Sequence, residues 1–301
     1  MRLLIIGGVA AGTSAASKAR RNNEKAEIVL YEKGPDISYA SCDTPYFIGG
    51  LIKDIKTLTP RGVDFFKKRY NVDVKIHHEV QAIDPEARSL TIRNLETDET
   101  FIDHYDKLII STGAKSVVPP IPGAEQDHVF SLRTIQDTLK IDSFIKKNKP
   151  QTAAIIGSGS IGMELAENLS RLGLEIHVIE MAPQINPALD PDMSVHIEKH
   201  LNEHGVKTYT NTQAAKIESS SLLTADGERI PGDIVIMATG VRPEVSLARD
   251  ARIDLGATGA IAVDERMQTN DPDVYACGDC VEHFDLIRQK AGWFPLGSTA
   301  N

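Results

Sequence analysis

The 301-residue sequence has few cysteines and no long apolar run, and both absences limit what it can be. Three cysteines (Cys42, Cys277 and Cys280) do not suggest a disulfide framework, so we expect a protein of the reducing cytoplasm. No apolar segment approaches the roughly 20 residues that a membrane-spanning helix requires. The start of the chain reaches glycine after only four aliphatic residues, which is too short for a signal peptide and typical of a buried strand.

Positive charge is also scarce. Lysine and arginine together number 33, against 42 aspartates and glutamates, and the formal net charge is -9. This balance argues against nucleic acid or an anionic membrane as the main partner. With 41% hydrophobic and 25% charged residues, the composition is that of an ordinary soluble globular protein, and the length suits about two domains.

One pattern occurs twice along the chain. In each copy an aliphatic run leads into a glycine-rich turn (GGVAAG, then GSGSIG), a helix pattern follows, and a second aliphatic strand ends at an acid, Glu32 or Glu180. The aliphatic runs span residues 3–6 and 153–156, the second strands span 28–31 and 176–179, and later strands end in Thr-Gly at 112–113 and 239–240. An internal repeat of this kind is stronger evidence than either copy alone.

The second copy has the spacing of a dinucleotide-binding βαβ unit. A pyrophosphate must approach backbone N–H groups at a helix N-terminus, where the helix dipole favours an anion and side chains would obstruct it. Gly157, Gly159 and Gly162 provide that approach, and Glu180, about twenty residues on, reaches the adenosine ribose. Its carboxylate repels a 2′-phosphate, and no arginine follows in residues 181–187. This unit therefore predicts NADH rather than NADPH.

The first copy departs from the pattern. Gly7 and Gly12 frame its turn and Glu32 ends its second strand, but Val9 occupies the middle glycine position. A valine there would push a pyrophosphate outward or shift the turn. From the turn alone, the ligand of the first unit stays open.

The domain order is also open at this point. Residues 117–123 contain a proline cluster, which removes backbone donors and suits a crossover between domains. A matching crossover at residues 241–243 would return the chain to the first domain, so the second domain would be inserted in the first. The alternative is two domains in series.

The segment from Thr269 to Cys280, TNDPDVYACGDC, resembles the third FAD motif of the pyridine nucleotide-disulfide oxidoreductases. In that family the aspartate of the motif, here Asp279, holds the ribityl chain of FAD. The resemblance implies an α/β fold of two Rossmann-like dinucleotide-binding domains, with FAD as the ligand of the first. Because the motif follows the NADH unit, it also implies insertion. The expected FAD-binding domain comprises residues 1–118 and 242–301, and the expected NADH-binding domain comprises residues 119–241.

A second resemblance concerns the segment around Cys42. DISYASCDTPYFIGG is similar to the loop of the family's single-cysteine branch, which contains coenzyme A-disulfide reductases, NADH-dependent persulfide reductases, and NADH oxidases and peroxidases. The last residues, WFPLGSTAN, resemble a segment that lies against the flavin in that branch. The resemblance implies that Cys42 is the redox centre, which receives electrons from NADH through FAD. The loop is compatible with a helix N-terminus that favours the thiolate. A buried structural cysteine is the alternative.

The resemblance assigns further contacts residue by residue. Those to FAD are Gly7, Ala10, Ala11, Gly12, Glu32, Lys33, Ser41, Val80, Thr112, Gly113, Arg133, Gly278, Asp279 and Ala300. Those to NADH are Gly157, Gly159, Ile161, Gly162, Glu164, Glu180 and Gly240. Those to the coenzyme A portion of a substrate are Ser14, Lys18, Arg21 and Ser38, with Ser41 also matching such a position.

Some of these residues have plainer alternatives. Lys18, Arg20 and Arg21 also fit a solvated helix end, and Glu164, which the pattern places on the first turn of its helix, also fits an ordinary N-terminal charge. Cys277 and Cys280 form a C-x-x-C pair with His283 beyond, the pattern of a zinc or thioredoxin-like site. Because Gly278 and Asp279 match the FAD motif, we expect apolar packing and no metal there.

The sequence also differs from the branch at several points. Asp43 stands where glycine is usual, and an adjacent carboxylate would raise the pKa of a thiol unless it points away. Ser160 replaces an aromatic residue that gates the nicotinamide pocket in the family. A histidine near the first turn, frequent in oxidases and peroxidases, has no counterpart at Ala10. The family's dimerisation domain would follow Asn301, so we expect a homodimer for the full-length protein.

The function expected is NADH-dependent reduction of a small disulfide, persulfide or polysulfide, with coenzyme A species favoured. Three alternatives stay open. In the first, an NADH oxidase or peroxidase cycles Cys42 through sulfenic acid. In the second, a flavin reductase serves a small electron-transfer protein without using Cys42. The third is a redox-sensing nucleotide-binding module.

Overall fold

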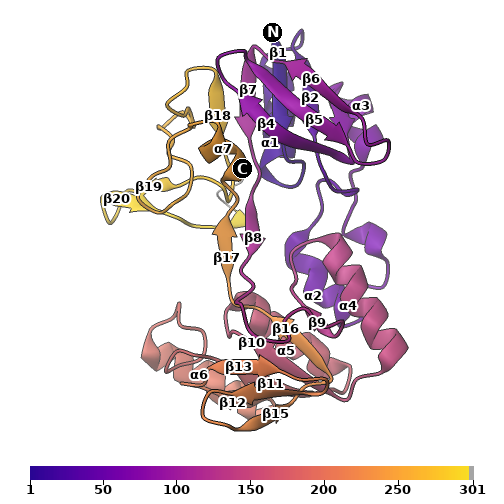
Figure 1. The fold of residues 1–301 in the computed structure, drawn as a ribbon, viewed down its shortest axis with the longest axis vertical. Helices are drawn as coiled ribbons and strands as arrows, with labels where there is room; N and C mark the ends of the chain where they lie inside the picture. Colours follow the sequence, from indigo (N-terminus) through magenta and orange to yellow (C-terminus); the bar gives the residue numbers. More distant parts are fainter. Residues whose placement is uncertain (298–301) are drawn as a thin grey trace. The chain divides into compact units, whose positions relative to one another are not determined.

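The computed structural model describes residues 1–297, which form two compact units, each built around a parallel five-stranded sheet (Figure 1). The first unit comprises Met1–Tyr39, Thr59–Lys115 and residues 243–297. The second unit comprises Ala40–Leu58 and Ser116–Arg242. No helix in residues 1–297 is long and apolar enough to cross a membrane.

The first unit has the strand order β18-β7-β1-β2-β3, with every pairing parallel. The strands are β1 (Arg2–Ile6), β2 (Glu27–Tyr31), β3 (Asp73–Lys75), β7 (Lys107–Ile110) and β18 (Val274–Ala276). One face carries α1 (Ala11–Asn22) and α3 (Val63–Tyr70). The other carries an antiparallel sheet of β4 (His78–Asp84), β5 (Ser89–Asn94) and β6 (Thr100–His104), with α7 (Ser246–Asp250). A hairpin of β19 (His283–Asp285) and β20 (Lys290–Gly292) follows.

The residues of β1 explain why this sheet is covered on both faces. Leu4 and Ile6 pack into the apolar cluster beneath β4 and β5, whereas Leu3 and Ile5 pack into the cluster beneath α1 and α3. Alternate residues of a strand point to opposite faces, so an unbroken aliphatic run is stable only between two layers. Each of these side chains contributes about 1.5–3 kcal/mol when buried.

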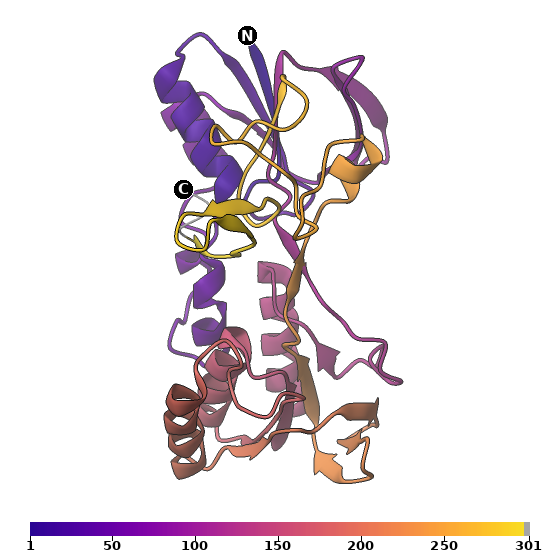
Figure 2. The same cartoon turned by 90° about the vertical axis from the view of Figure 1, so that its left-hand side faces the viewer.

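The second unit repeats the plan with the strand order β12-β11-β10-β16-β9, again all parallel. Its strands are β9 (Val129–Phe130), β10 (Thr152–Ile156), β11 (Glu175–Ile179), β12 (Lys207–Tyr209) and β16 (Ile234–Met237). Its longer helices are α4 (Ile135–Asn148), α5 (Ser160–Arg171) and α6 (Pro191–Glu203). The antiparallel strands β13 (Ala214–Ile217), β14 (Ser221–Thr224) and β15 (Arg229–Pro231) cover the face opposite α4 and α5 (Figure 2).

The chain order confirms an α/β fold in which the second Rossmann-like unit is inserted into the first. Strands β7 and β18 are neighbours in one sheet, yet the whole second sheet lies between them in sequence. The chain leaves the first unit through β8 (Ala114–Ser116) and returns through β17 (Val241–Pro243), and these two strands pair with each other.

The segment Ala40–Leu58 differs from the expected domain limits, which placed it in the first domain. It contains η1 (Ser41–Asp43), α2 (Thr44–Ile48) and η2 (Ile55–Thr57). Helix α2 packs against α4 and α5, and Ile48 is part of the apolar core of the second unit (Figure 1). The segment therefore belongs to the second unit, because four of the five residues of α2 bury their side chains there.

Candidate functional site

Two glycines of the second unit are required by the fold itself. Gly157, at the end of β10, has φ +102°, and an added Cβ would stand 2.8 Å from the carbonyl carbon of Ala238. A Cβ on Gly162 in α5 would overlap the carbonyl oxygen of Gly157. Both obstacles are backbone atoms, which cannot turn aside. These glycines therefore allow the close packing of strand, turn and helix.

The middle glycine of this turn has a different reason to be there. Gly159 has an ordinary φ of -68°, and an added Cβ would meet no protein atom within 4 Å. Neither conformation nor internal packing requires glycine at this position. Gly159 is the N-cap of α5, it makes no side-chain cap, and the first turn holds no acidic residue. The turn therefore leaves room for an anionic group at the first-turn N–H donors, as a pyrophosphate requires.

The acid of the second unit is held beside this turn. Oε2 of Glu180 accepts hydrogen bonds from the N–H (2.9 Å) and the hydroxyl (2.7 Å) of Ser158, and Oε1 accepts one from the N–H of Ala182 (2.8 Å). A carboxylate has about four acceptor sites, so it can still accept hydroxyl donors of a ribose. The sequence pattern missed the role of Ser158, because nothing local pairs that hydroxyl with an acid 22 residues away.

The first unit repeats this arrangement. Gly7 has φ +98°, and its Cβ would stand 2.9 Å from the carbonyl carbon of Ser111. A Cβ on Gly12 would overlap the carbonyl oxygen of Gly7. Glu32 accepts the N–H of Gly8 on Oε2 and the N–H of Gly34 on Oε1, both at 2.7 Å. The anchored acid is thus common to both units.

The segment near the end of the sequence lies beside the first turn of α1. Strand β18 pairs with β7, and the N–H of Cys277 continues the ladder to the carbonyl of Ile110 at 3.0 Å. Gly278 has φ +80°, and a Cβ on it would stand 2.7 Å from the Cβ of Ala11. Asp279 follows directly, and its carbonyl accepts the indole N–H of Trp293 at 2.8 Å.

The structure thereby brings several predicted positions to one edge of the first sheet. The glycine turn follows β1, Glu32 follows β2, Thr112 follows β7, and Gly278 with Asp279 follows β18. In open parallel sheets, ligands bind beyond the carboxyl ends of the strands, where the strand order reverses. The reversal here lies between β1 and β7. Residues far apart in sequence therefore lie at one edge of the same sheet.

Other predicted positions are more scattered. Val80 is buried in β4, Lys33 is exposed next to Glu32, and the hydroxyl of Thr112 donates to the carbonyl of Glu244 at 2.6 Å. Gly113 follows Thr112 with φ +70°, and Ala10 is the N-cap of α1. Ser41 and Arg133, both predicted to contact FAD, belong to the second unit, as do Ile161 and Gly240. Ala300 lies outside the described residues.

Glu164 is not on the first turn of its helix, as the pattern placed it, but is the fifth residue of α5. Its carboxyl is partly buried. Burial, together with the nearby charges of Glu167 and Asp43, raises its pKa. Each of these factors disfavours the charged form. The helix begins at Ser160, and its dipole favours negative charge mainly in the first turn. Glu164 lies beyond that turn, so the dipole stabilises its charged form little.

The Cys42 thiol is exposed, whereas the helix that follows it is anchored. Cys42 lies in η1, and α2 begins two residues later at Thr44. The hydroxyl of Thr44 donates to the carbonyl of Ser41 at 2.8 Å, which ties the turn to the helix. Asp43 is exposed at the N-cap of α2. The Cys42 thiol is thus exposed to solvent next to a helix whose side chains are mostly buried.

The other two cysteines have the opposite environment. Burial, with a contribution from Cys280, raises the pKa of the Cys277 thiol to about 12. Burial also raises the pKa of Cys280, whose thiol donates to the carbonyl of Cys277 at 3.2 Å. Among residues 1–297, no group of three or more His, Cys, Asp or Glu side chains is arranged to hold a metal ion. Cys280 belongs to the apolar core of the first unit.

This difference predicts the thiol titre of the native protein. Because its pKa is raised to about 12, the Cys277 thiol is almost wholly protonated at pH 8, and a thiol reacts as its thiolate. We expect iodoacetamide to modify Cys42 alone in the native protein and all three cysteines in urea, as counted by mass spectrometry. Rapid native modification of Cys277 or Cys280 would contradict the burial described here.

Three of the predicted substrate contacts share one face of α1. Ser14, Lys18 and Arg21 are four and three residues apart, which places them on the same side of a helix. Lys18 and Arg21 are exposed. Ser38 lies beside the glycine turn, with φ +49° and its N–H bonded to the carbonyl of Gly8 at 2.9 Å. The structure leaves this face compatible with an anionic ligand.

Arg20 differs from its basic neighbours. Its guanidinium donates to the carbonyls of Tyr70 (2.7 Å) and Asn71 (2.9 Å) at the end of α3. The alternative of a solvated helix end therefore does not hold for Arg20, which joins two helices. Charge patterning could not distinguish it from Lys18 and Arg21, because its partners are backbone atoms 50 residues away.

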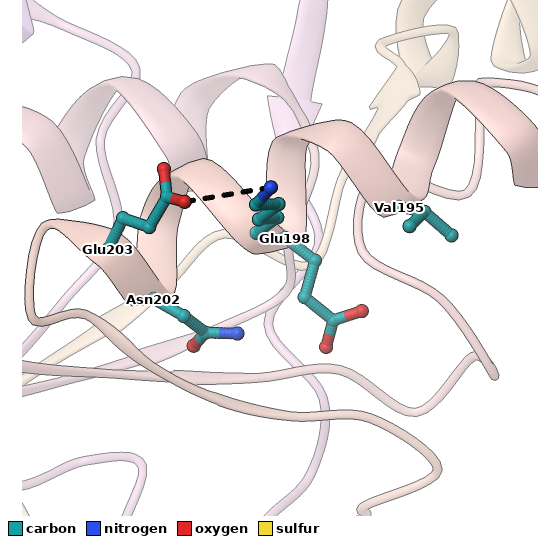
Figure 3. A pocket seen from close by; sticks show the side chains of 5 residues that line it. Val195, Glu198, Asn202 and Glu203 are labelled. Atoms are coloured by element: carbon teal, nitrogen blue, oxygen red, sulfur yellow. Dashed lines mark ion pairs between the residues drawn. The ribbon is translucent and has the colours of Figure 1, made fainter.

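A hollow on the second unit lies apart from the motifs. It is lined by Val195, Glu198, Lys199, Asn202 and Glu203, all from α6, and the ion pair of Lys199 with Glu203 spans its edge (Figure 3). None of the predicted site residues lines it. We therefore assign it no part in the chemistry.

Comparison with known proteins agrees with this geometry. The sequence model described as pyridine nucleotide-disulphide oxidoreductase matches residues 1–292. A NADH oxidase of Methanocaldococcus jannaschii is 39% identical over 100% of this chain and 67% of its own length. A coenzyme A disulfide reductase of Staphylococcus aureus is 34% identical over 95% of this chain and 65% of its own length.

Two solved structures are similar over the whole chain. The reduced CoADR-RHD of Bacillus anthracis has a TM-score of 0.98 and 39% identity, and this chain covers 54% of it. The NAD-dependent persulfide reductase from A. fulgidus has a TM-score of 0.96 and 38% identity, and this chain covers 57% of it. The chain thus spans about two thirds of the curated relatives and just over half of the solved proteins.

Proposed function

Because the chain belongs to the pyridine nucleotide-disulphide oxidoreductase family, we propose that it is part of a flavoprotein that uses NADH to reduce a low-molecular-weight disulfide or persulfide at Cys42. The observation that carries the proposal is the contrast among the three thiols. Cys42 is exposed on an anchored turn, whereas Cys277 is half-buried, Cys280 is buried, and both have raised pKa values. Of the three thiols, Cys42 is therefore the most accessible to a sulfur substrate.

The residues around the first glycine turn fit FAD. We propose that the first-turn donors of α1 bind its pyrophosphate, that Glu32 binds its adenosine ribose, and that Asp279 holds its ribityl chain. When bound, FAD supplies two-electron transfer between a nicotinamide and a thiol or disulfide. The support from this chain is the position of Gly278 against Ala11, which places Asp279 at the same edge as the turn.

The second turn fits NADH. Gly159 leaves space above α5 for a pyrophosphate, and the anchored carboxylate of Glu180 would accept the ribose hydroxyls. A 2′-phosphate would face that carboxylate at close range, so NADPH is disfavoured by repulsion between like charges. A solved relative is an NAD-dependent persulfide reductase, which supports the same nucleotide.

The overall reaction balances in electrons and protons. NADH provides a hydride, which is two electrons and one proton, and solvent provides one more proton. Together they convert one sulfur–sulfur bond into two thiols, or a persulfide into a thiol and hydrogen sulfide. The part of Cys42 is to attack the substrate sulfur as a thiolate and to release the first thiol.

Coenzyme A species are the substrates that this chain suits best. The exposed Lys18 and Arg21, on one face of α1 with Ser14, would meet the phosphates of coenzyme A. A curated relative is a coenzyme A disulfide reductase, which supports this class. NADH oxidase activity is the second candidate, favoured by the relative of that name that is 39% identical.

Steady-state consumption of NADH by the full-length protein tests the proposal. The acceptors compared are coenzyme A disulfide, coenzyme A persulfide, polysulfide, hydrogen peroxide, oxygen and a small electron-carrier protein. We expect the highest kcat/KM with a coenzyme A sulfur species, and a much lower value when NADPH replaces NADH. A higher kcat/KM with oxygen, peroxide or the carrier protein than with any sulfur species would overturn the assignment.

A further inference from the structure

The helix that carries the Cys42 turn meets α5 at an unusually close contact. Gly49 is the C-cap of α2, with φ -72° and ψ 0°, a conformation open to any residue. An added Cβ would nevertheless stand 2.8 Å from Cβ and 2.9 Å from Cγ of Asn168. The backbone fixes the Cβ of Asn168, so no rotamer change of that side chain relieves this contact. Space alone therefore requires glycine at position 49.

The partner in this contact is a polar residue in an apolar core. Asn168 is fully buried in α5, between Leu165 and Leu169, which belong to the main cluster of the second unit. Its amide nitrogen donates to the carbonyl of Glu164 at 2.8 Å. Its Oδ1 is buried and has no hydrogen-bond partner among the described residues. Burial of an unpaired amide oxygen destabilises the folded state, because the oxygen loses its hydrogen bond to water and gains none in return.

A purely structural role does not account for asparagine at this place. A leucine or alanine would fill a helix interior without leaving an unpaired acceptor. The Oδ1 atom instead faces Gly49, and Cα–H groups at close helix contacts serve as weak donors to oxygen. The amide of Asn168 also links this contact to the backbone of Glu164, one turn earlier in α5.

Other contacts leave the Cys42 turn dependent on α2. Ser41, Cys42 and Asp43 are all exposed, so the turn has no buried side chain of its own. It is tied to Thr44 at one end and, through the N–H of Ala40, to the carbonyl of Leu58 (2.8 Å) at the other. The position of α2 on α5 therefore determines the position of the Cys42 thiol.

We propose that Asn168 is a positioning residue for the redox thiol. Its side chain contacts Gly49 and so fixes the position of α2 on α5. The inference deepens the proposed function, since it assumes that the position of Cys42 matters to the reaction. Displacement of a reacting group by about 1 Å can lower a rate by about 100-fold. Asn168 lies on α5, the helix that begins at the proposed NADH turn. One helix therefore carries both the nucleotide site and the contact that positions the thiol.

The test compares four variants of the flavin-loaded protein: Gly49→Ala, Asn168→Ala, the double variant, and Gly62→Ala as a matched control. An added Cβ on Gly62 meets nothing within 4 Å, and its φ of -84° is ordinary. The main measurement is hydrogen exchange of the backbone amides at the end of α2, followed by mass spectrometry well below the melting temperature. We expect about tenfold faster exchange in each single variant, since α2 opens more often. The double variant should lie nearer to wild type than Gly49→Ala does, because alanine at 168 removes Oδ1 and Cγ, two of the three atoms that the new methyl group meets, although the Cβ of residue 168 stays.

A second measurement separates positioning from a loss of stability. The kcat for the sulfur substrate should fall about 10-fold to 100-fold in Gly49→Ala and Asn168→Ala. Flavin reduction by NADH, followed by stopped flow, and the KM for NADH should stay within about twofold of wild type. If Gly49→Ala fails to fold, folding of the double variant is itself the rescue.

Two results would overturn the inference. One is wild-type hydrogen exchange of α2 in Asn168→Ala despite a lower melting temperature, which would make the asparagine merely structural. The other is a double variant whose defects equal the sum of the single ones, since residues in contact are expected to couple. The hydrogen-exchange comparison does not require Cys42 to be catalytic. Failure of the proposed function, shown by turnover in Cys42→Ser, would therefore be distinguishable.

Discussion

Replacement of Cys42 by serine is expected to lower turnover of sulfur substrates by about 10³-fold or more. Serine keeps the size and exposure of the side chain, but its hydroxyl cannot exchange with a sulfur–sulfur bond at neutral pH. Reduction of the flavin by NADH should continue at the wild-type rate, because it precedes the step at the thiol. Steady-state turnover with coenzyme A disulfide and stopped-flow absorbance of the flavin measure the two steps separately.

The matched control is Cys280→Ala, which removes a buried thiol that we give no part in the reaction. It should lower the melting temperature through the small cavity that it leaves, with kcat close to wild type. Wild-type turnover of sulfur substrates in Cys42→Ser would show that electrons reach the acceptor without this thiol. The flavin reductase of an electron-carrier protein would then be the better assignment.

The two glycines of the second turn are expected to separate folding from nucleotide binding. In Gly162→Ala the new methyl group overlaps the carbonyl oxygen of Gly157, so the strand, turn and helix cannot pack as they do. We expect a loss of about 3 kcal/mol or more in the free energy of unfolding. Gly159→Ala places its methyl group in open space, and we expect a loss of about 1 kcal/mol or less, from the weaker N-cap.

Gly159→Ala, which should change stability little, should weaken the binding of NADH strongly. The methyl group of Gly159→Ala stands where the pyrophosphate of NADH would approach the first-turn donors, so we expect the Kd for NADH to rise about tenfold or more. Urea unfolding and a fluorescence titration with NADH give the two quantities on the same samples. Unchanged NADH affinity in Gly159→Ala would mean that the nucleotide does not approach at this turn.

Much of the architecture could be predicted from the sequence, because it is encoded locally. Aliphatic runs at 3–6 and 153–156 must be buried on both faces, and the glycines that follow them permit one kind of turn. The acids at the ends of the second strands follow from the same short repeat. Insertion of one unit into the other was predictable because a motif near the end of the chain resembles part of an FAD site.

The sequence by itself therefore determined the two βαβ units, their order along the chain and the three thiols to be compared. Only the tertiary structure decided that Cys42 is exposed while Cys277 is half-buried and Cys280 is buried, that Arg20 joins two helices, and that the Cys42 segment packs on the second unit. It also separated Gly159, which the fold does not need, from Gly162, which it does. The physical reason is that turns and periodicity depend on neighbouring residues, whereas burial and close contact depend on which surfaces, distant in sequence, come together in the fold.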